Sequence, residues 1–89
     1  MVEESQWTSF LATLDETHEW PCLYLFKFIA PRDKAEEVMA LFPEGTAVDA
    51  RFSSTGKYVS LTAEVEMDCG AEVVAVYRLV EGIEGVRAL

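Results

Sequence analysis

The residues best equipped for chemistry stand together in one short stretch. That stretch reads Arg51-Phe52-Ser53-Ser54-Thr55-Gly56-Lys57-Tyr58. Its hydroxyls, its flexible glycine and its two cations could hold a carboxylate or a phosphate against backbone N–H groups. The candidate residues for binding a small anionic ligand are therefore Lys27, Arg51, Ser53, Ser54, Gly56, Lys57 and Tyr58.

The same stretch also suits a solvated hairpin turn. Gly56 can take a positive φ there without any ligand to justify it, and serine and threonine are common turn residues. A Gly-Lys pair is weak evidence for phosphate binding unless a strand, a loop and a helix surround it in that order. The hairpin interpretation is the simpler of the two.

The sulfur and imidazole groups form a second candidate cluster. Cys22 opens a predicted strand and Cys69 follows another, so both thiols should lie at one end of the sheet, and His18 is close to Cys22 in sequence. A redox pair would fit this placement, but three ligands without a defined fourth do not make a zinc site. We predict no metal, buried or half-buried structural thiols, and a His18 that closes the first helix, where a cation is favoured.

The remaining polar and aromatic candidates are better explained by structure. Glu64 and Glu66 share one face of a predicted strand, where water can solvate them, and Trp7 and Trp20 suit packing. No arrangement of nucleophile and base can be inferred from the chain. We therefore predict no enzyme activity, no catalytic residue and no cofactor.

The first element that must position these groups is an amphipathic helix over residues 5–17. Its apolar residues recur at helical spacing, and they are Trp7, Phe10, Leu11 and Leu14. Ser5 is the predicted N-cap. We divide the chain into this N-terminal extension, residues 1–19, and one domain, residues 20–89.

The order of the later elements predicts the fold. Strands are expected over 22–30, 46–54, 57–67 and 86–89, and helices over 34–42 and 70–81. Asp33 and Glu36 resemble a capping box before the first of these helices. The order βαββαβ predicts an α+β, ferredoxin-like two-layer sandwich with antiparallel strand order 4-1-3-2, both helices on one face, and the extra N-terminal helix added.

This fold leaves one sheet face open. The covered face should carry Tyr24, Phe26, Phe28, Val48, Ala50, Phe52, Val59, Leu61, Ala63 and Val65. The open face then exposes Leu23, Leu25 and Ile29, at a cost of about 1.5–3 kcal/mol each. Either the chain's own helix face or a second subunit should cover them, so the candidate interface residues, in one chain or in a homodimer, are Leu23, Leu25, Ile29, Trp7, Phe10, Leu11 and Leu14.

Composition excludes some partners. The 89 residues include 7 basic and 16 acidic side chains, for a formal charge of −9. Nucleic acid and anionic lipid both select basic surfaces, so neither is an expected partner. The N-terminus lacks the basic and apolar segments of a secretory signal, which predicts a cytoplasmic protein. A locally basic patch in the middle of the chain remains available to an anion.

Three segments carry a family resemblance. They are Leu23-Tyr24-Leu25-Phe26-Lys27-Phe28-Ile29, Ser53-Ser54-Thr55-Gly56-Lys57-Tyr58-Val59-Ser60, and the tail that ends in Ile83-Glu84-Gly85-Val86-Arg87-Ala88-Leu89. Over about residues 20–89 the chain resembles the small YbeD-like bacterial family of unknown function. The resemblance implies a ferredoxin-like fold comparable to the ACT regulatory domain, and it brings no catalytic residues.

Two functions fit these observations. The first is a regulatory or small-ligand-binding module like an ACT domain, acting as a dimer. ACT domains typically use a glycine-bearing loop after the first strand, whereas this chain has Ala30-Pro31-Arg32-Asp33-Lys34 there. The alternative is an adaptor that docks another protein on the open sheet face or on an edge strand.

Overall fold

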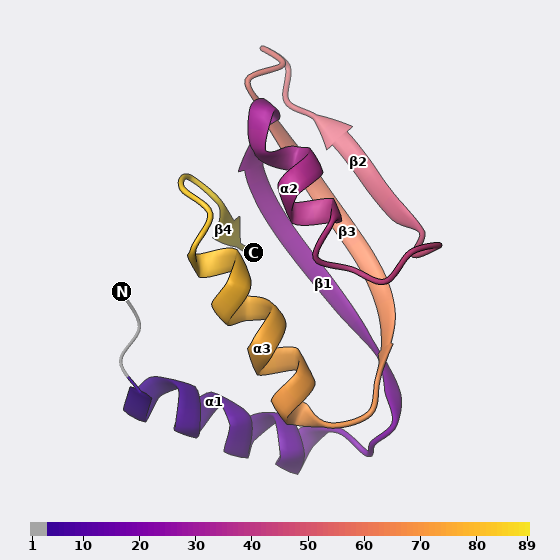
Figure 1. Cartoon of the computed structure of the whole chain (residues 1–89), viewed down its shortest axis with the longest axis vertical. Helices are drawn as coiled ribbons and strands as arrows, with labels where there is room; N and C mark the ends of the chain where they lie inside the picture. Colours follow the sequence, from indigo (N-terminus) through magenta and orange to yellow (C-terminus); the bar gives the residue numbers. More distant parts are fainter. Residues whose placement is uncertain (1–3) are drawn as a thin grey trace.

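The computed structural model describes residues 4–89 and shows an α+β protein (Figure 1). Its elements are α1 (Glu4–Thr17), β1 (Cys22–Pro31), the 3-10 turn η1 (Arg32–Lys34), α2 (Ala35–Met39), β2 (Val48–Phe52), β3 (Tyr58–Met67), α3 (Gly70–Glu81) and β4 (Arg87–Ala88). After α1, this is the predicted βαββαβ order. None of the helices described is long and apolar enough to cross a membrane.

The four strands form one antiparallel sheet in the order β2-β3-β1-β4. This is the predicted order 4-1-3-2, counted from the other edge. The central pair is long, because β1 and β3 stay in register from Cys22 opposite Met67 to Pro31 opposite Tyr58. The edge strand β4 is short and pairs only with Phe28 and Ile29.

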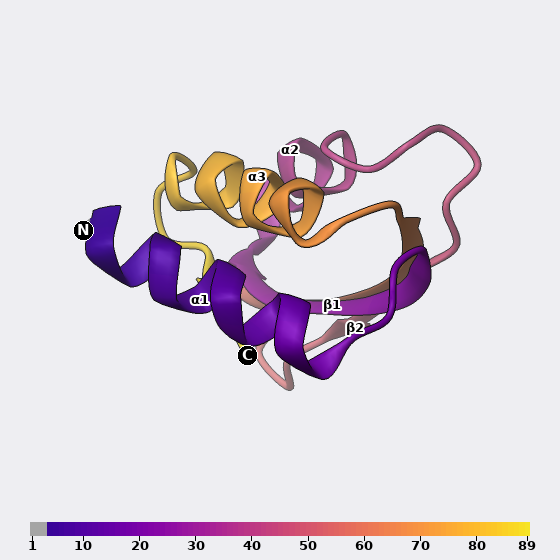
Figure 2. The same ribbon diagram turned by 90° about the horizontal axis from the view of Figure 1, so that it is seen from below.

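Helices α2 and α3 lie on the same side of the sheet, as a ferredoxin-like fold requires (Figure 2). Helix α1 lies across the end of the molecule where β1 and α3 begin, and it packs against α3. The sheet face opposite α2 and α3 remains open. The ferredoxin-like prediction is therefore confirmed, with α1 as an addition at one end.

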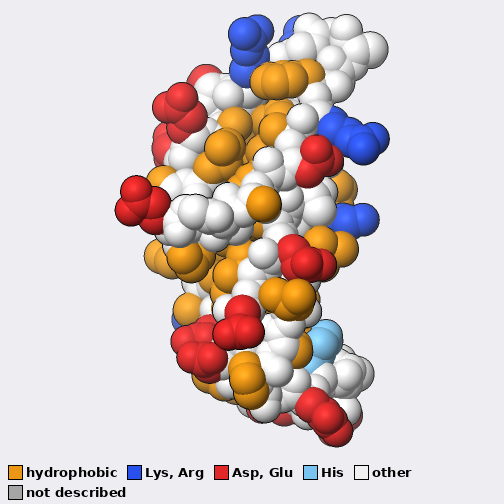
Figure 3. Space-filling model, turned by 90° about the vertical axis from the view of Figure 1, so that its right-hand side faces the viewer, with side chains coloured by type: hydrophobic (Ala, Val, Ile, Leu, Met, Phe, Trp, Pro, Cys, Tyr) orange, Lys and Arg blue, Asp and Glu red, His pale blue; other side chains and the backbone are white. Residues whose placement is uncertain are grey.

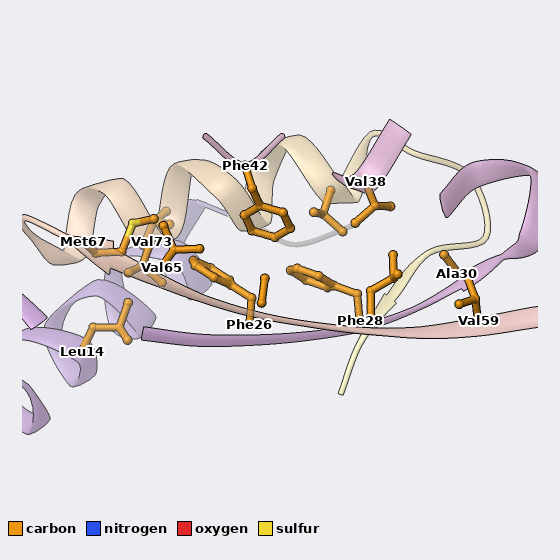
Figure 4. Packing of buried hydrophobic residues seen from close by; sticks show 14 residues of the cluster. Leu14, Phe26, Phe28, Ala30, Val38, Phe42, Val59, Val65, Met67 and Val73 are labelled. Carbon is orange, nitrogen blue, oxygen red and sulfur yellow. The ribbon is translucent and has the colours of Figure 1, made fainter. Parts of the chain in front are cut away.

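The core lies between the sheet and the two helices (Figure 4). Alternate residues of β1 and β3 point into it, as the period of two in a strand dictates. Among its most deeply buried side chains are Phe26, Phe28, Leu61, Val38, Val59 and Val73. The Phe42 ring lies over the sheet and contacts the rings of Phe26 and Phe28, at centroid distances of 5.4 and 6.4 Å.

The helix predicted over 34–42 is shorter than expected. The chain first makes the 3-10 turn η1, whose Arg32 N–H donates to the carbonyl of Lys57 at 2.9 Å. Helix α2 then has Lys34 as its N-cap, with no side-chain cap, so the predicted capping box of Asp33 and Glu36 does not form. The prediction of Ser5 as an N-cap was also wrong, because Ser5 lies inside α1.

Two residues of β2 are less covered than predicted. Ala50 and Phe52 lie opposite Leu61 and Val59, on the helix side of the sheet, yet both are exposed. The reason is that β2 is an edge strand and α2 packs over β1 rather than over β2. Phe52 is 61% exposed, and the Arg32 guanidinium lies over its ring, 5.8 Å from the ring centre.

Candidate functional site

The segment 53–58 forms the hairpin turn between β2 and β3. The Ser53 N–H donates to the Tyr58 carbonyl and the Gly56 N–H donates to the Ser53 carbonyl, both at 2.9 Å. Gly56 has φ +74°, as predicted for this turn. The Ser53 hydroxyl accepts the Tyr58 N–H at 3.3 Å and lies 3.4 Å from the Thr55 hydroxyl. The turn therefore uses several of its own polar groups to hold its shape.

Two of the three cations predicted to bind a ligand, Lys27 and Arg51, do not converge on this turn. Arg51 pairs with Asp49 on the same strand, with Nε and Oδ2 separated by 3.2 Å. Lys27 lies further along the open face, opposite Thr62. Of the predicted ligand residues, Ser53, Ser54, Gly56, Lys57 and Tyr58 lie together in the hairpin, whereas Lys27 and Arg51 belong to the sheet face.

A hollow of about 510 Å³ lies beside the hairpin and was not predicted as a unit. It is lined by Arg32, Asp33, Glu36 and Lys57. The link is the backbone hydrogen bond between Arg32 and Lys57, which joins the start of η1 to the turn. Two cations and two carboxylates balance in charge, so the hollow suits a ligand that carries both charges better than a simple anion.

A second hollow, of about 580 Å³, lies between the end of α2 and the start of β2. Its lining residues are Met39, Ala40, Phe42, Pro43, Glu44, Gly45, Thr46 and Val48. Glu44 is the charged residue of this set, so the lining offers no cation to an anionic ligand. The sequence pattern marked this loop only as a helix stop.

The open face of the sheet carries an apolar stripe along β1. Leu23 is 61% exposed and Leu25 is 48% exposed, while Ile29 is half-buried. The neighbouring strand β3 alternates cleanly and turns only polar or charged side chains and Tyr58 to this face. The exposure predicted for the stripe is thus present in the single chain.

The apolar face of α1 packs on α3 and does not cover that stripe. The ring of Phe10 meets that of Tyr77 edge-on, with centroids 5.3 Å apart. The Arg78 guanidinium of α3 lies over the Trp7 ring at 5.6 Å and binds Glu4 at 2.6 Å. Leu11 and Leu14 join the same core, with Leu14 buried. The chain's own helix α1, one of the two elements expected to cover the stripe, therefore packs on α3 instead.

A close approach fixes α1 against the start of α3. A Cβ on Gly70 would lie 2.6 Å from Oδ1 of Asp15 and 2.9 Å from Cδ1 of Leu11. The Trp20 indole donates to the same Asp15 oxygen at 2.9 Å. A carboxylate at a helix N-terminus is favoured by the helix dipole. Sequence reasoning missed this contact, because nothing local connects Gly70 with α1.

The charges on the open face are segregated. Strand register places Lys27, Arg51 and Arg87 in the half that contains Ile29. The same register places Glu64 opposite Leu25 and Glu66 opposite Leu23, in the other half. In the edge view of Figure 3, basic side chains gather toward the hairpin end and the margin of the sheet.

The thiols and the histidine form no metal site. Both cysteines are free; Cys22 is partly exposed and Cys69, the N-cap residue of α3, is exposed rather than half-buried as predicted. His18 ends α1 as predicted: its N–H donates to the Leu14 carbonyl at 3.0 Å and its ring stacks on Trp20. Within residues 4–89 no three His, Cys, Asp or Glu residues could share a metal ion.

A partly buried tyrosine, Tyr77, lies where α1, α3 and the sheet meet. The hydroxyls of Tyr77 and Tyr24 are 3.3 Å apart, and the rings of Phe26 and Phe28 each lie 5.6 Å from the Tyr77 ring. Burial, together with Tyr24, raises the pKa of Tyr77 above its usual value. The group therefore stays neutral and structural across the physiological pH range.

Comparison with known proteins adds a family match but no function. A family model described as "Protein of unknown function (DUF493)" matches residues 15–89, from the last turns of α1 to the C-terminus. No curated protein matches the chain, and no solved structure matches it.

Proposed function

The chain belongs to the family of proteins of unknown function DUF493, as its YbeD-like segments predict, and we propose that it is a non-catalytic module that docks another protein on its open sheet face. The observation that carries this proposal is the exposed pair Leu23 and Leu25 at the centre of the sheet. Each would gain free energy from burial, about 1.5–3 kcal/mol for a full side chain.

The sequence of β1 supports the proposal independently of exposure. A strand with one wet face alternates apolar and polar residues, whereas a strand covered on both faces reads as a continuous apolar run. Strand β3 follows the first rule, but β1 reads Cys-Leu-Tyr-Leu-Phe-Lys-Phe-Ile-Ala, which is apolar except for Lys27 and so comes closer to the second. Its composition is that of a strand whose outer face is also buried.

Affinity purification with two matched variants tests the proposal. Leu25→Glu places a charge on the open face, and Leu79→Glu places the same charge on the outside of α3, where Leu79 is 57% exposed. A partner identified by mass spectrometry should be retained by wild type and by Leu79→Glu and lost by Leu25→Glu. Equal retention by all three proteins, or none by wild type, refutes docking on this face.

A second candidate, a regulatory small-ligand-binding role like that of an ACT domain, is favoured by one observation. The hollow beside the hairpin brings Arg32 and Lys57 together with Asp33 and Glu36. An amino acid carries the complementary pair of charges. Thermal-shift screening with amino acids, nucleotides and carboxylates should give a stabilisation that Lys57→Ala abolishes. The proposal fails if no compound in the panel shifts the melting temperature.

A further inference from the structure

We infer that the protein docked on the open face is a second copy of this chain, packed sheet to sheet about a two-fold axis. This inference rests on the proposed docking function and names its partner. The apolar stripe alone would not choose a partner. The distribution of charge around the stripe does, because it is complementary to itself.

The open face divides into two halves of opposite charge. Arg51 lies at the level of Ile29, and Lys27 lies two residues before Ile29 on β1. Glu64 lies at the level of Leu25, and Glu66 at the level of Leu23. Asp49 also lies in the Ile29 half, where its carboxylate and the Arg51 guanidinium offset each other, so Lys27 and Arg87 are the residues that leave the half basic.

Three of these charges have no partner within the described residues, 4–89. Among residues 4–89, the side chains of Lys27, Glu64 and Glu66 form no hydrogen bond or ion pair. Each is exposed on the open face. They are therefore available to a molecule that lies on this face.

A two-fold axis in the plane of contact satisfies these charges. If the axis crosses β1 between Leu25 and Lys27, it exchanges the two halves of the face. Register then sets Leu23 of one copy over Ile29 of the other, and Lys27 beside Glu64, twice by symmetry. Such an interface is isologous, since the same patch serves both copies, and packed sheets of this kind lie about 10 Å apart.

The face is large enough for such a dimer. The molecule measures 39 × 29 × 20 Å, and the layers stack along its shortest dimension, so the open face occupies the broad side. A stable interface buries roughly 800 Å² on each partner. That is a modest share of the 6054 Å² of accessible surface on the single chain.

The test is sedimentation of charge-reversed variants, alone and mixed. Lys27→Glu and Glu64→Lys should each weaken self-association about tenfold or more, because each sets like charges against one another across the interface. An equimolar mixture of the two should associate again, since the unlike copies restore both pairs. Lys34→Glu and Glu84→Lys make the same charge changes away from the open face, and they should leave self-association unchanged.

The rescue by mixing cannot arise inside one chain, so it reports contact between copies. A wild type that remains monomeric at its highest soluble concentration overturns the inference, as does a dimer that mixing fails to restore. Either result leaves the docking function standing if capture of another protein still depends on Leu25. If no such dimer forms and the capture of another protein does not depend on Leu25 either, the docking function is overturned as well.

Discussion

Two neighbouring residues of β1 should respond to substitution in opposite ways. Phe26 points into the core and has no exposed surface, whereas Leu25 points outward and is 48% exposed. Phe26→Ala should cost about 3–5 kcal/mol through lost burial and the cavity left behind. A chain of 89 residues has a total stability of about 4–13 kcal/mol, so this variant should be severely destabilised or unfolded.

Leu25→Thr should cost the isolated chain no more than about 1 kcal/mol. Roughly half of the leucine is already in water, so only about half of a burial worth 1.5–3 kcal/mol can be lost. Threonine keeps a branched Cβ that suits a strand, which limits any change in backbone preference. The small cost would show that the stability of the single chain depends little on the Leu25 side chain.

Equilibrium unfolding in guanidinium chloride, followed by tryptophan fluorescence, measures both variants. The protein should be dilute, because association would add a concentration-dependent stabilisation to wild type. Under those conditions, a loss for Leu25→Thr as large as that for Phe26→Ala would refute the reasoning. It would mean that part of the chain covers Leu25 in solution.

Three further substitutions test the packing around the site. Tyr77→Phe removes the hydroxyl contact with Tyr24 and should be about 0.5–1.5 kcal/mol less stable near pH 7. Burial raises the pKa of Tyr77 above its usual 10, so wild type loses stability as pH rises above 10, and denaturation at several pH values should show the deficit of Tyr77→Phe shrinking there. Gly56→Ala should lose about 1–2 kcal/mol in urea unfolding, because φ is +74° with open space around the Cβ; Gly82→Ala, with φ −74°, is the matched control and should be nearly neutral. Gly70→Ala should lower the melting temperature by an amount equivalent to about 1–3 kcal/mol, since its Cβ would lie 2.6 Å from a carboxylate oxygen of α1; an unchanged melting temperature would mean that α1 yields freely.

Much of the fold could be predicted because it follows from the periodic spacing of apolar residues along the chain. The clean alternation of 58–67 predicts a strand with one wet face, and the structure has β3 over those residues. The helical spacing of apolar residues predicts 70–81, which is α3. Once these elements are in order, the handedness of crossovers leaves few sheet arrangements, and the predicted one is found.

What could not be predicted depends on contacts between distant residues. The chain departs from the start of the helix predicted over 34–42 because the Arg32 N–H bonds to the Lys57 carbonyl, much further along the chain. The exposure of Phe52 follows from the position of α2, which packs over β1 rather than over the edge strand β2. Local pattern contains neither fact.

The candidate site was predictable in its residues but not in its grouping. Sequence reasoning placed Lys27, Arg51 and the hairpin in one ligand site, since they are close in the predicted sheet. The structure divides them, because Asp49 neutralises Arg51 and Lys57 turns toward the hollow at Arg32. The Asp49–Arg51 pair has the spacing of two that puts both side chains on one strand face, whereas the approach of Lys57 to Arg32 depends on the folded chain and has no local pattern.

The contrast between β1 and β3 bears most directly on function. Both strands lie inside the sheet and both bury one face under the same helices. Folding of the single chain therefore makes the same demand on their outer faces, yet only β1 carries large aliphatic residues there. The apolar surface is therefore narrow, about the width of one strand, and Glu64 and Glu66 of β3 lie beside it. A partner that meets this face must therefore bring an apolar ridge with cations beside it, and the Ile29 half of the same face, with Lys27 and Arg87, has that character.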